Sequence, residues 1–96
     1  MKVGVLESAW RDLREGHTFY EQQEEGVGHY FLDTLCAEID SLTLYGGIHP
    51  VRLGYHRMLS AKFPYAIYYR IDHGDVVVRA VLDCRRDPTW IKEQLK

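Results

Sequence analysis

The spacing of apolar side chains in the first half of the chain predicts two helices. From residue 7 to about residue 25, less polar side chains recur at helical intervals on one side, with charged ones on the other. The less polar side consists of Ala9, Trp10, Leu13, His17 and Tyr20. After a break at residues 26–28, a second stripe ending near residue 45 consists of Tyr30, Phe31, Leu35, Ile39 and Leu42. Two helices joined by a short glycine turn predict a helical hairpin.

Short apolar runs predict strands in the rest of the chain. The first is residues 1–6, and three more are residues 55–62, 65–72 and 75–82. The last two are joined by His73-Gly74, a tight hairpin turn in which glycine readily takes a positive φ. A final short helix begins at Asp87-Pro88 and runs through Leu95, because aspartate is a favourable N-cap and proline suits the first helical turn.

The element order strand, helix, helix, strand, strand, strand, short helix is typical of an α+β fold. We expect a single domain over residues 1–96, with the helical hairpin packed on one face of a small, mainly antiparallel sheet. A chain of 96 residues is long enough for one hydrophobic core.

The two longest strands are apolar on both faces, although one helical hairpin covers only one. In residues 65–72 the first face carries Tyr65, Ile67, Tyr69 and Ile71, and the second carries Ala66, Tyr68, Arg70 and Asp72. In residues 75–82 simple alternation places Val77 and Val81 together, opposite Val76, Val78, Ala80 and Leu82. Three explanations stay open for the second face: the C-terminal helix covers it with Trp90 and Ile91, the chain forms a homodimer, or another protein docks there.

Charge is unevenly divided along the chain, whose formal net charge is −2. Residues 1–48 contain three basic and nine acidic side chains, whereas residues 49–96 contain nine basic and five acidic ones. This asymmetry is compatible with an anionic or acidic partner for the second half. The alternative is that the acidic residues form solvated helix faces.

Neither a metal site nor a membrane segment is expected. Cys36 and Cys84 have no CxxC spacing, and the five histidines form no HExxH or HxH motif, so we expect no metal and no cofactor. The chain lacks an apolar run long enough to span a bilayer, and its first residues do not read as a secretory signal. A cytoplasmic location with both cysteines reduced is the expectation.

Two groups of basic residues are candidates for chemistry. His56, Arg57 and Lys62 lie on one predicted strand and would suit phosphodiester binding and cleavage, or they are ordinary exposed bases. Arg85 and Arg86 follow the last strand, where two guanidinium groups can hold a phosphate or carboxylate. Because aspartates flank the pair at positions 83 and 87, we expect one arginine to form a local ion pair and the other to face a ligand.

Two stretches resemble a known family. The segment YHRMLSAKFPYAIYYRID at residues 55–72 and the segment VVVRAVLDCRRDPTWI at residues 76–91 are similar to the RelE/ParE superfamily, the toxins of bacterial type II toxin–antitoxin and plasmid stabilization systems. The most specific parts are residues 57–69 and 85–88. The resemblance implies the RelE/ParE-like fold and a co-encoded cognate antitoxin whose C-terminal segment wraps the toxin.

The resemblance leaves two cellular targets open. RelE-like members are ribosome-dependent endoribonucleases that cut mRNA, whereas ParE-like members poison DNA gyrase. The cluster of catalytic lysines is thin here, and Trp90 occupies the region of the catalytic tyrosine. A pI of about 6.2 is also poorly suited to ribosomal RNA, where neutralisation of phosphates dominates affinity. These departures favour a ParE-like toxin that acts by protein binding.

The expected functional residues differ between the hypotheses. Binding of the target or antitoxin is expected to use Arg57, Lys62, Arg70, Arg85, Arg86 and Trp90. In the nuclease alternative the catalytic set is His56 as general base with Arg57, Arg85 and Arg86 stabilising the phosphorane charge. The third hypothesis is a non-toxic homodimeric relic.

Overall fold

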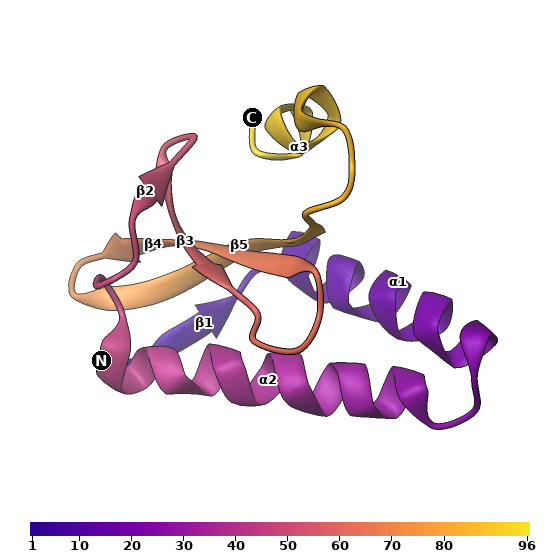
Figure 1. The fold of residues 1–96 in the computed structure, drawn as a ribbon. Coiled ribbons are helices and arrows are strands. Elements are labelled where there is room, and N and C mark those ends of the chain that lie inside the picture. The colour runs from indigo at the N-terminus through magenta and orange to yellow at the C-terminus, as the bar shows by residue number, and fades with distance from the viewer.

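A computed structural model describes residues 1–96 as a five-stranded sheet with helices on both faces (Figure 1). Its elements are β1 (Val3–Val5), α1 (Glu7–Gln23), α2 (Val27–Tyr45), β2 (Val51–Arg52), β3 (Tyr55–Leu59), β4 (Tyr65–Asp72), β5 (Asp75–Asp83) and α3 (Pro88–Gln94). The strand order is β1-β5-β4-β3-β2, with β1 parallel to β5 and every other pair antiparallel. The expected α+β fold and the helical hairpin are confirmed.

The boundary between the helices differs from the expected break. Helix α2 begins at Val27, so Gly28 lies inside it, and of the three residues at the expected break only Gly26 has a positive φ, of 91°. Gly28 instead permits close helix packing, because a Cβ atom there would lie 2.5 Å from the backbone oxygen of His17. The carboxylate of Glu21 accepts hydrogen bonds from the N–H groups of Gly26 and Gly28, and these bonds lower the pKa of Glu21.

The strand predicted at residues 55–62 is shorter, and a two-residue strand precedes it. Strand β3 ends at Leu59 because the chain turns over residues 60–64, where the N–H of Ser60 bonds to the oxygen of Tyr65 at 2.9 Å. Strand β2, which was not predicted, pairs with β3 through a turn at Leu53-Gly54. Both turn residues have positive φ, 56° and 85°, as a two-residue hairpin turn requires.

The helical hairpin packs on one face of the sheet and forms the larger core. Its fully buried large side chains are Leu13, Phe31, Leu35, Leu42, Ile67, Tyr69, Val76, Val78 and Val81. Figure 1 shows α1 and α2 side by side beneath the sheet, on the opposite side from α3. This arrangement follows from the helical stripes and from the apolar alternation in β4.

The face assignment predicted for residues 75–82 is wrong because β5 contains a bulge. Tyr69 pairs with Val78 but Tyr68 pairs with Ala80, so Arg79 is an extra residue on β5. An extra residue reverses the alternation beyond it. Val76, Val78 and Val81 consequently join the helical side, and Ala80 and Leu82 face the other way.

Helix α3 covers much of the second face, so the first of the three explanations is the one the structure shows. The smaller core there consists of Ala66, Tyr68, Ala80, Leu82 and Leu95, with Trp90 and Ile91 packed against it. Arg79 fixes the end of the chain, because its guanidinium donates to the backbone oxygens of Gln94 at 2.9 Å and Lys96 at 3.3 Å. The β2–β3 hairpin rises from the same side of the sheet as α3 (Figure 1).

Candidate functional site

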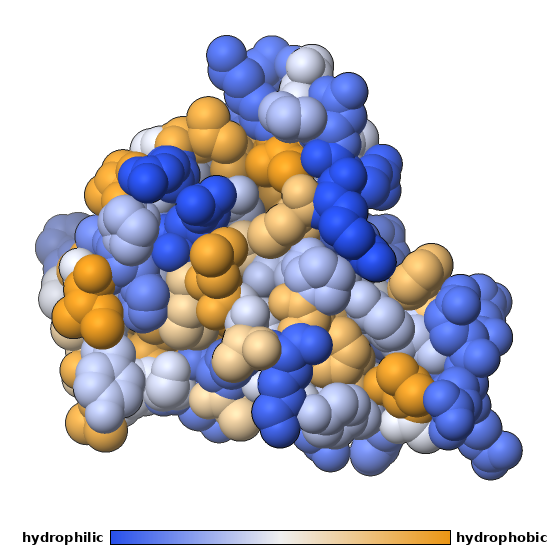
Figure 2. Space-filling model, in the orientation of Figure 1, coloured by the Kyte–Doolittle hydropathy of each residue, from blue (hydrophilic) through white to orange (hydrophobic).

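A groove remains on the second face between the β2–β3 turn and α3. Its volume is about 430 Å³, and it is lined by Leu53, Arg57, Tyr68, Cys84, Arg86, Pro88, Thr89, Ile91 and Lys92. Three of these side chains are cationic and none is acidic. In the upper part of Figure 2, where α3 and the hairpin lie, strongly hydrophilic side chains flank a band of apolar ones. The groove therefore combines positive charge with an apolar lining.

Arg57 and Tyr68 reach the groove because they are opposite each other in the β3–β4 ladder. Tyr68 is only 3% exposed, and burial raises its pKa. The Nε atom of Arg57 is buried and has no hydrogen-bond partner. An unsatisfied buried donor of this kind is unusual in a folded protein. The floor of the groove thus contains a buried tyrosine and a guanidinium with a free donor.

Arg85 holds the turn that follows β5. Its side chain binds both carboxylate oxygens of Asp83, through Nε at 3.0 Å and Nη2 at 2.8 Å, and its backbone N–H donates to the same carboxylate. These contacts lower the pKa of Asp83. The carboxylate of Asp87 accepts from the N–H of Thr89 at 2.7 Å and caps α3 as expected. The expected local Arg–Asp pair is therefore Arg85–Asp83.

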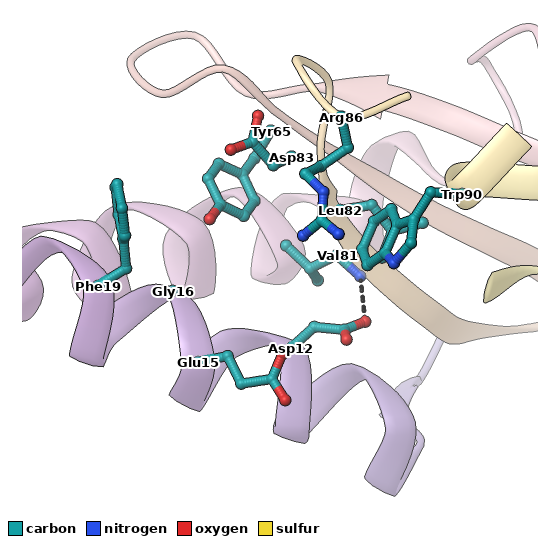
Figure 3. A pocket seen from close by; sticks show the side chains of 10 residues that line it. All are labelled: Asp12, Glu15, Gly16, Phe19, Tyr65, Val81, Leu82, Asp83, Arg86 and Trp90. Atoms are coloured by element: carbon teal, nitrogen blue, oxygen red, sulfur yellow. Dashed lines mark hydrogen bonds between the residues drawn. The ribbon is translucent and has the colours of Figure 1, made fainter. Parts of the chain in front are cut away.

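Arg86 forms no salt bridge and lies between two cavities, although its charge helps to lower the pKa of Asp83. Its guanidinium stacks on the ring of Trp90, with Cζ 3.7 Å from the ring centroid. It lines the groove on one side and a smaller cleft of about 260 Å³ on the other. Figure 3 shows this cleft, with Arg86 extending between Asp83 and Trp90 toward Val81 and Asp12.

Helix α1 supplies the acidic wall of the smaller cleft. Asp12 accepts a hydrogen bond from the N–H of Val81 at 3.0 Å, so its carboxylate bonds to the edge of β5 beyond the end of β1 (Figure 3). Burial raises the pKa of Asp12 to about 6. Glu15 and Phe19 complete the α1 side of the cleft. Negative charge thus lines the cleft on one side of Arg86, and positive charge lines the groove on the other.

The structure does not bring the proposed nuclease residues together. His56 pairs with Tyr69 and stacks on its ring at 5.0 Å, on the helical side of the sheet. Its Nδ1–H donates to the backbone oxygen of His49 at 2.7 Å. Arg57 points to the opposite face, and Arg85 is bound to Asp83. Of that set only Arg57 and Arg86 share the groove.

The proposed binding residues are also dispersed. Lys62 lies in the β3–β4 loop, with Nζ 5.5 Å from the ring centroid of Tyr30, and Arg70 is exposed on β4 outside the groove. The groove residues not foreseen as parts of this site are Leu53, Tyr68, Cys84, Pro88, Thr89, Ile91 and Lys92. Only the Leu53-Gly54 pair carried a local signal, because glycine suits a tight turn.

Neither a metal centre nor a membrane-spanning helix is present. No group of three or more His, Cys, Asp or Glu side chains is placed to hold a metal ion. No helix is both long enough and apolar enough to cross a bilayer.

The fold is similar to that of a solved toxin–antitoxin structure. A chain of the structure titled "Chromosomal ParDE TA system from P. aeruginosa" matches this one with a TM-score of 0.75 at 13% sequence identity, over 84% of this chain and 92% of that one. The expected RelE/ParE-like fold is confirmed. No protein-family model matches the chain, and no curated protein matches it.

Proposed function

We propose that the chain is the toxin of a type II toxin–antitoxin module, and that it acts by binding a protein target, DNA gyrase, as ParE-like toxins do. Two observations from different sources support the toxin assignment. The segments at residues 55–72 and 76–91 resemble the RelE/ParE superfamily, and the fold matches a chain of a ParDE system. The module implies a cognate antitoxin as the first partner.

The absence of a histidine or a carboxylate from the groove is the observation that favours a non-nuclease. Cleavage of RNA by a protein side chain needs a general base within reach of the attacking hydroxyl and with a pKa near the working pH. His56 lies on the other face of the sheet. The titratable tyrosine and thiol of the groove, Tyr68 and Cys84, both have a pKa raised mainly by burial, which makes them weaker acids.

Asp12 has a pKa suitable for proton transfer but lies in the smaller cleft. Its pKa is about 6, and its carboxylate is bonded to the Val81 N–H. Arg86 is the only cationic side chain that lines this cleft, whereas Arg57 and Lys92 line the groove. Asp12 and the cationic cluster therefore lie in different cavities, an arrangement that favours binding over catalysis in the groove.

Expression without an antitoxin tests the proposal. We expect growth arrest, inhibition of supercoiling by purified gyrase, and no discrete mRNA cuts in primer-extension mapping. A His56→Ala variant should remain fully toxic and serves as the matched test of the nuclease alternative. Discrete cuts that disappear in this variant would establish RelE-like activity, and unaffected growth would favour the non-toxic relic.

A further inference from the structure

The five histidines divide into two groups by what their rings contact. Three bond through Nδ1 to a hydroxyl, a backbone oxygen or a carboxylate within the chain, whereas the rings of the other two form no hydrogen bond or ion pair. The first group is His49, His56 and His73, and the second is His17 and His29. Neutral imidazole is the commonest metal ligand in proteins, so rings without a partner are candidates for metal binding.

Helix packing brings His17 of α1 beside His29 of α2. A Cβ atom at Gly28 would lie 2.5 Å from the backbone oxygen of His17, so the helices approach each other closely at this point. The two ring centroids are 6.5 Å apart, with the ring planes at 73°. Zinc–nitrogen bonds of about 2.0–2.1 Å would place the centroids of two rings on one ion about 5–6 Å apart. Because His29 is exposed, a small change of its side-chain torsions closes this difference.

The charge around the histidine pair favours a cation. Residues 15–51 contain seven acidic side chains and no lysine or arginine. Glu21, one turn beyond His17 on α1, has both carboxylate oxygens bonded to backbone N–H groups at the start of α2. It therefore adds negative charge beside the pair without serving as a third ligand. An excess of negative charge raises the local concentration of metal cations.

Two cations near the pair are directed elsewhere. Arg14 precedes His17 by about one helical turn, but it forms an ion pair with Glu7. Lys62 lies over the ring of Tyr30, with Nζ 5.5 Å from the ring centroid. Neither side chain contacts an imidazole, so the lone pairs of the two rings stay accessible to an ion.

The number of ligands indicates which kind of metal site the pair can form. Structural zinc sites use four protein ligands, whereas no cluster of three or more ligating side chains is present in this chain. Two imidazoles would hold the ion and water would complete its coordination. Imidazole suits zinc, copper and nickel, whereas calcium and magnesium prefer oxygen ligands.

We infer that the α1–α2 hairpin binds one divalent late transition-metal ion, with zinc as the test case, between His17 and His29. The pair lies close to the turn that joins the two helices, and the groove lies on the other face of the sheet (Figure 1). The metal site is therefore independent of the proposed function. Because the ligands belong to different helices, the ion binds the folded hairpin and stabilises it by mass action.

Titration of zinc chloride into the full, untagged 15N-labelled chain tests the inference. We expect one equivalent of zinc to bind saturably in calorimetry and to shift the imidazole NMR signals of His17 and His29 together. The ring signals of His73 should not move. The melting temperature should rise by about 4–8 °C when free zinc is at about five times its Kd.

Two variants and one control locate the ion. His17→Gln and His29→Gln should each weaken zinc binding at least about tenfold and remove the rise in melting temperature, because one imidazole alone loses the chelate effect. His73→Gln removes an imidazole whose side chain is 97% exposed and should leave the affinity unchanged. The zinc-free spectrum of each variant shows whether it is folded. The exposed position of His29 keeps the test decisive if His17→Gln does not fold.

Three results would overturn the inference: no saturable binding, a shift of only one of the two rings, or wild-type affinity in a folded His29→Gln variant. Shifts centred on Cys36 or Cys84 would place the ion at a thiol and would contradict the assignment equally.

Discussion

The two faces of the sheet are packed to different degrees. The helical face joins twelve buried residues in one core, and no side chain of that core is polar apart from its tyrosine hydroxyls. The α3 face has a core of five buried residues and a groove beside it that contains the free Nε donor of Arg57. One sheet thus has the larger buried core on one side and, on the other, a smaller core beside a groove of cationic and apolar side chains. We expect substitutions in the larger core to lower stability most, and substitutions of groove residues on the second face to change binding.

The largest effect is expected from Phe31→Ala on the helical face. Phe31 is fully buried and packs against the rings of Tyr20, Phe63 and Tyr65. Removing the ring should lower the free energy of unfolding by about 3–5 kcal/mol. Urea denaturation followed by circular dichroism measures the change. A loss below about 1 kcal/mol would show that this core is less important than its burial suggests.

Leu95→Ala makes the matching change on the α3 face. Leu95 is 7% exposed and joins the smaller core next to the chain end. We expect a loss of about 2 kcal/mol, at the lower limit for a buried leucine because the C-terminal segment can adjust. Hydrogen exchange should accelerate at the amides of α3 and much less in β4 and β5. Equal acceleration throughout would mean that α3 unfolds only together with the rest of the molecule.

Asp12→Asn tests the contact by which α1 supports the edge of β5. The folded-state pKa of about 6 exceeds the ordinary 3.8, so the folded chain binds more protons than the unfolded chain between these values. Stability should therefore fall as pH rises from about 4 to about 6, by about 1–2 kcal/mol after allowance for partial exposure.

The asparagine variant can still accept the Val81 N–H bond but does not ionise. Its unfolding free energy should be nearly constant across this pH window, as measured by urea denaturation at pH 4.5, 5.5 and 6.5. An unchanged pH slope in the variant would assign the proton uptake to another group.

Local signals account for the parts of the fold that could be predicted. The His73-Gly74 turn and the Asp87 cap depend on neighbours in sequence, and both are present. The bulge at Arg79 was missed because β5 is apolar on both sides of it and no glycine marks it. The two-residue strand β2 exists only because β3 pairs with it. The groove could not be predicted, because it depends on where α3 docks and on the reversal of alternation after Arg79.

The adjacent arginines Arg85 and Arg86 give the smallest stability effects and the clearest functional contrast. Arg85→Ala removes an exposed ion pair and should cost at most about 1 kcal/mol. The pair also lowers the pKa of Asp83, so its contribution is present above pH 3.8 and is lost as pH falls further. Arg86→Ala removes only the stacking on Trp90, which contributes about 0.5–1 kcal/mol at exposed sites.

Growth assays should separate these two variants, although their expected losses of stability are similar. Arg86→Ala removes a groove cation and should reduce toxicity or neutralisation by the antitoxin. Arg85→Ala should leave both properties close to wild type, because the guanidinium of Arg85 is already bound to Asp83. Comparing the two at equal expression levels separates loss of a contact from loss of fold. If Arg85→Ala were the more damaging variant, the turn conformation, and not the free guanidinium, would be what the partner recognises.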